Sequence, residues 1–122
     1  MDWRDAEETA RQYLQKWFRQ DFSKKKLSVG TAETPLHREF DAVSVDGRIV
    51  AMVKDYKQPE PQKIRNVMED VEFLRLVRAE KKLMFLTDPI FYVAFCRAKQ
   101  GDLVELRRLG IEFVSPFELT KY

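Results

Sequence analysis

Residues 39–56 read EFDAVSVDGRIVAMVKDY, two runs rich in β-forming residues on either side of Asp46-Gly47. An Asp-Gly dipeptide favours a two-residue type I′ turn, because both central residues of that turn need positive φ. We therefore expect a β-hairpin with strands from about Arg38 to Val45 and from Arg48 to Tyr56. The second run contains IVAMV, which is apolar on both faces, so its strand should be central and covered on both sides of the sheet.

The hairpin is preceded and followed by segments with clear helix and strand patterns. Apolar residues at three-and-four spacing predict a helix over residues 2–22, and Pro61 suits the first turn of a second long helix. Short apolar runs between turn signals predict further strands. The expected elements outside the hairpin are a helix at 2–22, a strand at 27–32, a helix at 61–77, a strand at 83–87, helices at 91–99 and 103–109, a strand at 111–114 and a short final helix opened by Ser115-Pro116-Phe117-Glu118.

This order of elements predicts an α/β fold. Helices that separate the later strands imply parallel crossovers beside the antiparallel hairpin, hence a mixed central sheet flanked by helices. A chain of 122 residues is the size of one domain, so we expect residues 1–122 to form a single domain. The 44% content of hydrophobic residues excludes disorder as a description of the whole chain.

Cysteine, histidine and net charge narrow the chemistry. Cys96 and His37 are the single residues of their types, which excludes an internal disulfide and zinc clusters of Cys and His. Any metal must therefore bind to carboxylates, which indicates a hard cation such as Mg²⁺ or Mn²⁺. The 22 basic and 20 acidic residues nearly cancel to a net charge of +2, so net charge alone does not indicate a polyanionic partner.

The sequence also carries weak indications of the protein's environment. No apolar run approaches the roughly 20 residues that span a bilayer, and the N-terminus MDWRDAEE is charged. We therefore expect no membrane segment and a cytoplasmic location. Charged residues make up 34% of the chain and Asn66 is its single asparagine, a composition typical of a thermophile.

A turn at Asp46-Gly47 fixes the register of the hairpin and brings polar residues onto an otherwise apolar face. Counting outward from the turn, Val43 faces Val50, Asp41 faces Met52 and Glu39 faces Lys54. Asp41 and Lys54 are then diagonal neighbours at the edge of a buried face, where neither tolerates being unpaired. In the first helix, Glu7 falls at the margin of the apolar face and can approach Asp41 if this helix covers the hairpin.

An acid in an initial helix, an aspartate in a strand before a hairpin and a lysine in the next strand resemble the PD-(D/E)xK nuclease superfamily. The stretches VKDYKQP, FLTDPIFYVAFCRAKQ and RLGIEFVSPFEL are similar to its Mrr-type endonucleases and archaeal Holliday junction resolvases. The resemblance implies the restriction-endonuclease-like fold with an αβββαβ core. It also implies Mg²⁺-dependent hydrolysis of phosphodiester bonds in DNA, with Lys54 and Asp41 as catalytic residues and Asp41 and Glu7 as metal ligands.

One position departs from this pattern, because Met52 stands where the motif requires an acid. A thioether supplies no hard oxygen ligand to Mg²⁺. Two replacement ligands can be expected: Glu39, on the same face at roughly 7 Å by strand rise, or Glu69 or Glu72 of the second long helix, since some members of the superfamily take a carboxylate from that helix. Asp55 alternates to the opposite face and would serve only if a bulge intervenes.

Basic residues near the lysine strand are candidates for contacts with DNA. Lys57, Lys63, Arg65 and His37 would bind phosphates if they cluster on the side of the site, and such binding would be sensitive to salt. The alternative is an ordinary solvated surface. Two hypotheses follow: a DNA-binding protein with the nuclease fold and an atypical or weakened catalytic site, or an inactive pseudo-nuclease that serves as a structural or protein-interaction module, with a homodimer as one assembly open to it.

Overall fold

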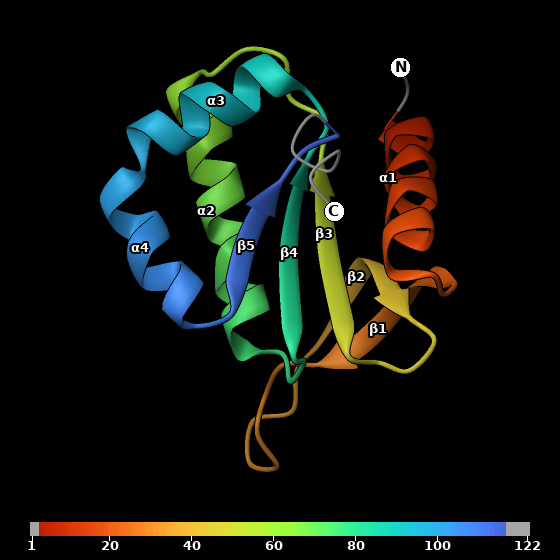
Figure 1. Cartoon of the computed structure of the whole chain (residues 1–122). Coiled ribbons are helices and arrows are strands. Elements are labelled where there is room, and N and C mark those ends of the chain that lie inside the picture. Colours follow the sequence, from red (N-terminus) through yellow and green to blue (C-terminus); the bar gives the residue numbers. More distant parts are fainter. Residues whose placement is uncertain (1–2, 117–122) are drawn as a thin grey trace.

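The computed structural model describes residues 3–116, with side chains from residue 5 onward, and shows a five-stranded mixed sheet between two helical layers (Figure 1). The strand order is β1-β2-β3-β4-β5. The pairs β1/β2 and β2/β3 are antiparallel, whereas β3/β4 and β4/β5 are parallel. The elements are α1 (Trp3–Phe18), β1 (Phe22–Ser28), β2 (His37–Ser44), β3 (Ile49–Lys54), α2 (Pro61–Leu76), β4 (Lys81–Leu86), α3 (Pro89–Ala98), α4 (Gln100–Arg108) and β5 (Ile111–Val114).

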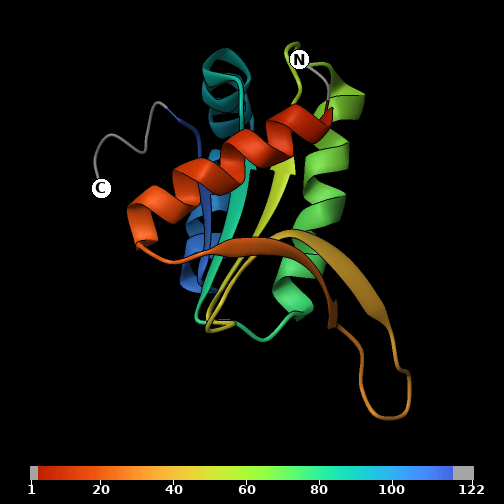
Figure 2. The same ribbon diagram turned by 90° about the vertical axis from the view of Figure 1, so that its right-hand side faces the viewer.

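The sequence from α1 to β4 has the αβββαβ order, and the fold class expected from the sequence is confirmed. Helix α1 covers one face of the sheet, and α2, α3 and α4 cover the other (Figures 1 and 2). Strand β3 is buried on both faces, as its IVAMV run predicts: Ala51 and Val53 pack in the layer of α1, and Val50 and Met52 pack in the layer of α2. None of the helices described between residues 3 and 116 is long and apolar enough to cross a bilayer.

The first helix and strand differ from the predicted boundaries. Helix α1 ends at Phe18, where Arg19 takes a left-handed conformation with φ of 54°. Strand β1 begins at Phe22, so Lys24, Lys25 and Lys26 lie within it, although the sequence predicted a strand over 27–32. These lysines are exposed on an edge strand. They do not alternate with apolar residues, so the sequence pattern did not indicate a strand there. The predicted final helix lies largely in residues 117–122, outside the described residues.

The hairpin turn has the predicted register but not the predicted type. Val43 pairs with Val50, as expected, but Gly47 is the residue of the turn with positive φ (73°). The loop therefore spans four residues, 45–48, and the Gly47 N–H donates to the Ser44 carbonyl at 2.9 Å. The Asp46 carboxylate accepts hydrogen bonds from the Ser44 hydroxyl at 2.7 Å and the Arg48 N–H at 3.0 Å. These bonds hold Asp46 in a conformation without positive φ, so the turn is not of type I′.

Two glycine substitutions should act in opposite directions on stability. A Cβ at Gly47 or Gly101 meets no atom within 4 Å, so only the backbone conformation distinguishes the two sites. Gly47→Ala should lower the free energy of unfolding by about 1 kcal/mol because an L-residue is strained at positive φ. Gly101→Ala, within α4, should raise it by up to about 1 kcal/mol. Urea denaturation of both variants checks the pair, and a Gly47→Ala variant as stable as the wild type would contradict the assigned turn.

Candidate functional site

A β-bulge in β2 determines where the predicted site residues lie. Ser23 pairs with Val43 and Lys25 pairs with Phe40, so two residues of β2, Asp41 and Ala42, oppose the single residue Lys24 of β1. An extra residue in one strand reverses the alternation of side chains beyond it. The expectation that Asp41 shares the face of Val43 and Lys54 is therefore wrong, and the side chain of Asp41 belongs to the layer of α1.

Asp41 is held at the bulge by contacts with β3 and α1. Its Oδ2 accepts a hydrogen bond from the Val53 N–H at 2.7 Å, and its backbone carbonyl accepts one from Arg11 Nη1 at 2.9 Å. The carboxyl groups of Asp41 and Glu7 share a hydrogen bond. The predicted approach of Glu7 to Asp41 is thus confirmed. The bulge is the reason for it, because regular pairing would place Asp41 on the opposite face of the sheet.

The two acids are partly buried, and the Glu7 carboxylate disfavours the ionised form of Asp41. Burial raises the pKa of Asp41 to about 6 with the help of the Glu7 carboxylate, against the opposing effect of the Val53 N–H. The side chain of Glu7 is 14% exposed, and its Oε2 is 2.9 Å from Lys24 Nζ. This contact raises the pKa of Lys24, which keeps the ammonium charged. Two cations contact Glu7 Oε2, Lys24 Nζ at 2.9 Å and Arg11 Nη1 at 4.0 Å.

The predicted catalytic lysine lies in the layer of α2. Lys54 Nζ is 2.6 Å from Asp70 Oδ2, and the two side chains are 24% and 10% exposed. Burial lowers the pKa of Lys54, but the Asp70 carboxylate outweighs it and the net shift is upward. Lys54 is therefore cationic at neutral pH, so it can stabilise an anion but cannot act as a general base.

Asp70 also contacts a second cation. Arg38 Nη2 is 3.4 Å from Asp70 Oδ1, and the Arg38 guanidinium lies 4.6 Å from the centroid of the Phe73 ring. Within the described part of the chain, Arg38 Nε is buried without a hydrogen-bond partner. Asp70 thus joins β2 and β3 to α2 through one carboxylate.

Neither helical acid that the sequence offered as a replacement ligand faces the lysine. Glu69 and Glu72 are both exposed, and Glu72 pairs with Arg75 at 3.4 Å. Asp70 is the α2 acid that turns inward. Its spacing was a usable signal, since it lies three residues after Val67 and four before Leu74 on the buried face of α2.

The described residues fit a hard cation only in part. Between residues 3 and 116, no three Asp, Glu, His or Cys side chains converge as a metal site would require. Glu39 is 51% exposed and reaches the acidic pair only through Lys24, at 3.7 Å. Met52 is 3% exposed in the apolar core. Glu7 and Asp41 are the residues that would hold Mg²⁺ or Mn²⁺, and two carboxylates suffice for Mg²⁺ when substrate phosphates and water supply the other oxygens.

The four predicted DNA-binding residues are not gathered in one place. Lys57 pairs with Asp55 at 3.0 Å, and Arg65 and Lys63 lie in the first turns of α2, where Lys63 Nζ is 4.9 Å from the Tyr56 ring centroid. These three cations surround the connection between β3 and α2. His37 instead pairs with Ser28 in the β1–β2 ribbon, toward the other end of α2.

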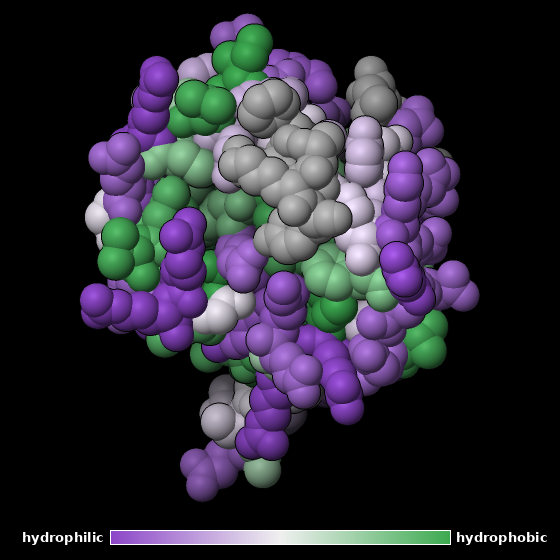
Figure 3. All heavy atoms as spheres, viewed as in Figure 1, coloured by the Kyte–Doolittle hydropathy of each residue, from purple (hydrophilic) through white to green (hydrophobic). Residues whose placement is uncertain are grey.

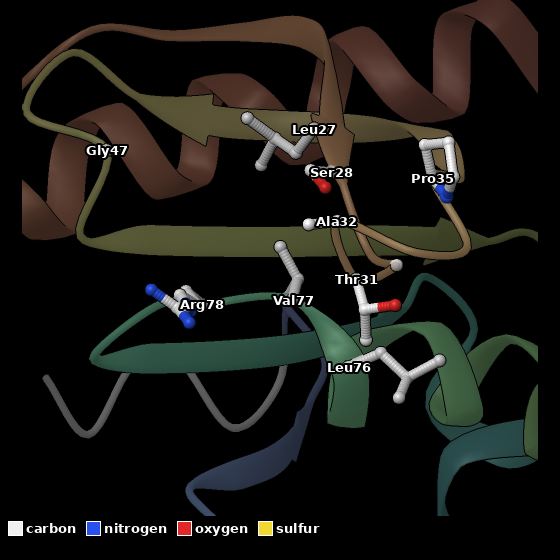
Figure 4. Close-up of a pocket in the computed structure, with 10 residues that line it drawn as sticks. Leu27, Ser28, Thr31, Ala32, Pro35, Gly47, Leu76, Val77 and Arg78 are labelled. Carbon is white, nitrogen blue, oxygen red and sulfur yellow. The ribbon is translucent and has the colours of Figure 1, made fainter.

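A hollow of about 740 Å³ separates the β1–β2 loop from the end of α2 (Figure 4). Its walls include Leu27, Thr31, Leu76 and Arg78, and none of the described residues that line it carries a carboxylate. Gly47 also borders it, at the start of β3, whereas Lys54 ends that strand about 20 Å away by strand rise. The hollow is therefore separate from the acids and the lysine described above.

No protein-family model, no curated protein and no solved structure matches this chain. The arrangement of Glu7, Asp41, Lys54 and Asp70 is accordingly the basis for assigning a function.

The raised pKa of Asp41 should produce a pH-dependent stability. A carboxyl with a folded pKa near 6 binds its proton more tightly when folded, so its contribution to stability is full below pH 4 and is lost as the pH rises through 6. Asp41→Asn should remove that loss. The free energy of unfolding of this variant, relative to wild type, should rise by about 1–3 kcal/mol from pH 4 to pH 7. Urea denaturation across this range measures it, with Glu33→Gln in the exposed β1–β2 loop as the control. A difference that is constant with pH would contradict the assignment.

Breaking the pair of Lys54 and Asp70 should be costly. Asp70→Ala leaves a partly buried ammonium with no counter-charge and should lower the free energy of unfolding by about 2 kcal/mol. The double variant Lys54→Met/Asp70→Leu should recover most of that loss, because it removes both charges. Glu72→Ala, at a 61% exposed position in the same helix, is the matched control and should change stability by less than about 0.5 kcal/mol. Equal losses in Asp70→Ala and Glu72→Ala would show that the inward pair contributes nothing.

Proposed function

We propose that this chain is a DNA-binding protein of the cytoplasm with the fold of the PD-(D/E)xK nucleases, in which Met52 replaces the second acid of the motif and Mg²⁺-dependent phosphodiester hydrolysis is weakened. The observation that carries the proposal is the convergence of Glu7 and Asp41. These acids come from α1 and β2 and meet in a partly buried place where the Glu7 carboxylate raises the pKa of Asp41. Acids held together against their repulsion are typical of a site that accepts a cation.

Charge at the pair supports a weak cation site. A proton shared near pH 6 relieves the repulsion of the two carboxylates in the free protein. A divalent cation bound there would replace the proton and help to neutralise a phosphate. With two protein carboxylates as its ligands, the cation would be held only weakly without substrate.

Lys54 would stabilise the negative charge of the substrate phosphate. Its ammonium is charged and 24% exposed at the end of β3, and Asp41 contributes to keeping it charged. In the free protein its partner is Asp70, so a substrate phosphate would have to draw the ammonium away from this carboxylate. Such competition lowers the gain from each phosphate contact, so we expect hydrolysis to be slow.

Lys57, Lys63 and Arg65 form the proposed contact with the DNA backbone. They lie around the β3–α2 connection, directly after Lys54 in the chain. Tyr56 lies between two of the cations, with its ring centroid 5.9 Å from Lys54 Nζ and 4.9 Å from Lys63 Nζ. The segment therefore adds three cations next to Lys54, of which Lys57 is paired with Asp55 at 3.0 Å in the free protein.

A second candidate, an inactive pseudo-nuclease that binds other proteins or a second copy of itself, is favoured by a different observation. Lys54 and Lys24 are both in short ion pairs, with Asp70 at 2.6 Å and Glu7 at 2.9 Å. Ion pairs of this kind stabilise a fold without any ligand. The two candidates differ in whether Asp41 and Glu7 bind a cation and whether the protein cleaves DNA.

The decisive experiment combines Mn²⁺ titration calorimetry with nicking of supercoiled plasmid. Wild type should bind one Mn²⁺ weakly and nick slowly, and Asp41→Asn should lose both properties. Glu7→Gln should likewise weaken Mn²⁺ binding and nicking, because Glu7 is the second carboxylate of the pair. Circular dichroism checks that both variants fold. If wild type neither binds Mn²⁺ nor nicks DNA, the pseudo-nuclease candidate replaces the first proposal.

Duplex binding should depend on the cations after β3. The triple variant Lys57→Ala/Lys63→Ala/Arg65→Ala should weaken binding and reduce the slope of log K against log salt by about 3, one for each lost phosphate contact. Fluorescence anisotropy with labelled duplex at several salt concentrations measures the slope. Lys16→Ala, on the exposed side of α1, is the control and should leave the slope unchanged. An unaltered slope in the triple variant would remove this segment from the proposed interface.

A further inference from the structure

Helices α3 and α4 leave a group of apolar side chains in contact with solvent. Ile90 is 74% exposed, Val93 42% and Val104 60%. Apolar side chains gather over these two helices in the space-filling view, at its upper and left side (Figure 3). Single exposed apolar residues are ordinary, whereas a contiguous group on two adjacent helices is typical of an interaction surface.

Two hollows make this surface concave. One, of about 420 Å³, is lined by Pro89, Ile90, Val93, Ala94 and Arg97. The second, of about 530 Å³, includes Val93, Arg97, Leu103, Val104 and Arg107. Because the hollows share Val93 and Arg97, they form one continuous surface, which we call the α3–α4 groove.

The charged residues that line the groove have one sign. Arg97 and Arg107 line it, and none of the described residues in its lining is acidic. Across residues 5–116, neither arginine is paired with a carboxylate. The groove therefore presents an apolar floor beside two exposed cations with no counter-charge of their own.

We propose that the α3–α4 groove binds an acidic amphipathic helix of a partner protein. Apolar residues at three-and-four spacing would occupy the floor, and flanking Asp or Glu would pair with Arg97 and Arg107. The ten residues of α3 extend about 15 Å, which matches roughly three turns of a bound helix.

Other occupants suit the groove less well. A second copy that used the same face would bring Arg97 and Arg107 of each chain toward the like charges of the other, which is unfavourable. A bilayer is a flat apolar phase that favours protruding side chains, whereas this surface is hollowed. A DNA backbone would leave Ile90 and Val93 against phosphates, without an apolar partner.

Fluorescence anisotropy with two labelled model peptides tests the proposal. Both peptides have the same apolar positions at helical spacing, and one carries Glu and the other Lys at the flanking positions. The acidic peptide should bind wild type with saturation, and the basic peptide should bind at least about tenfold more weakly, as opposite charges at two cations imply. The double variant Arg97→Glu/Arg107→Glu should reverse this preference. Val93→Asp should weaken the acidic peptide about tenfold through loss of the apolar contact.

The controls separate the groove from other surfaces. Val45→Asp changes the most exposed large apolar side chain of the described residues, at 78%, far from the groove, and should leave binding unchanged. Asp41→Asn should also leave it unchanged, since the groove is independent of the proposed catalytic site. Equal binding of both peptides, or no reversal in the double arginine variant, would overturn the proposal. So would binding to vesicles of anionic lipid without binding to the acidic peptide, or self-association that Val93→Asp abolishes.

Discussion

The hydrogen bond from the Val53 N–H to the Asp41 carboxylate is the interaction on which the arrangement of the site depends. If the register of Val43 and Val50 continued, Val53 would face Phe40 and bond to the backbone of β2. The bulge interrupts that ladder, and a side-chain oxygen takes the place of a carbonyl at 2.7 Å. A buried N–H without a hydrogen-bond partner would lower the stability of the fold. The Asp41 carboxylate therefore stabilises the bulge, and the bulge in turn places this carboxylate in the layer of α1.

The bulge also explains why the polar residues form two groups on opposite faces of the sheet. Glu7 and Asp41 lie in the layer of α1, and Lys54 and Asp70 lie in the layer of α2. Each group contains a carboxylate and a lysine in direct contact, with Lys24 completing the first. Each carboxylate therefore has its counter-charge within its own layer: Lys24 contacts Glu7, and both Lys54 and Arg38 contact Asp70.

Much of the fold could be predicted from residues with local effects. The run at β3 specified a central strand, Pro61 marked the first turn of α2, and Val43 was correctly placed opposite Val50. The bulge could not be predicted, because an inserted residue leaves no trace in a run of apolar and polar residues until the partner strand is known. Once it is missed, every residue before it is assigned to the wrong face, which is how Asp41 was paired with Lys54. Asp70 was missed for a different reason: an acid on an apolar helical face is recognised as a partner only when the opposing cation is located.

The exposed lysines of β1 have a consequence for how the sheet ends. Strand β1 is at the edge of the strand order, and an edge strand has backbone groups free to pair with a strand of another molecule. Lys24, Lys25 and Lys26 are consecutive and all exposed on that edge. A second copy added there in either direction would place ammonium groups against ammonium groups, so these lysines protect the edge from growth into fibrils, and Lys24 among them also supplies a counter-charge to Glu7.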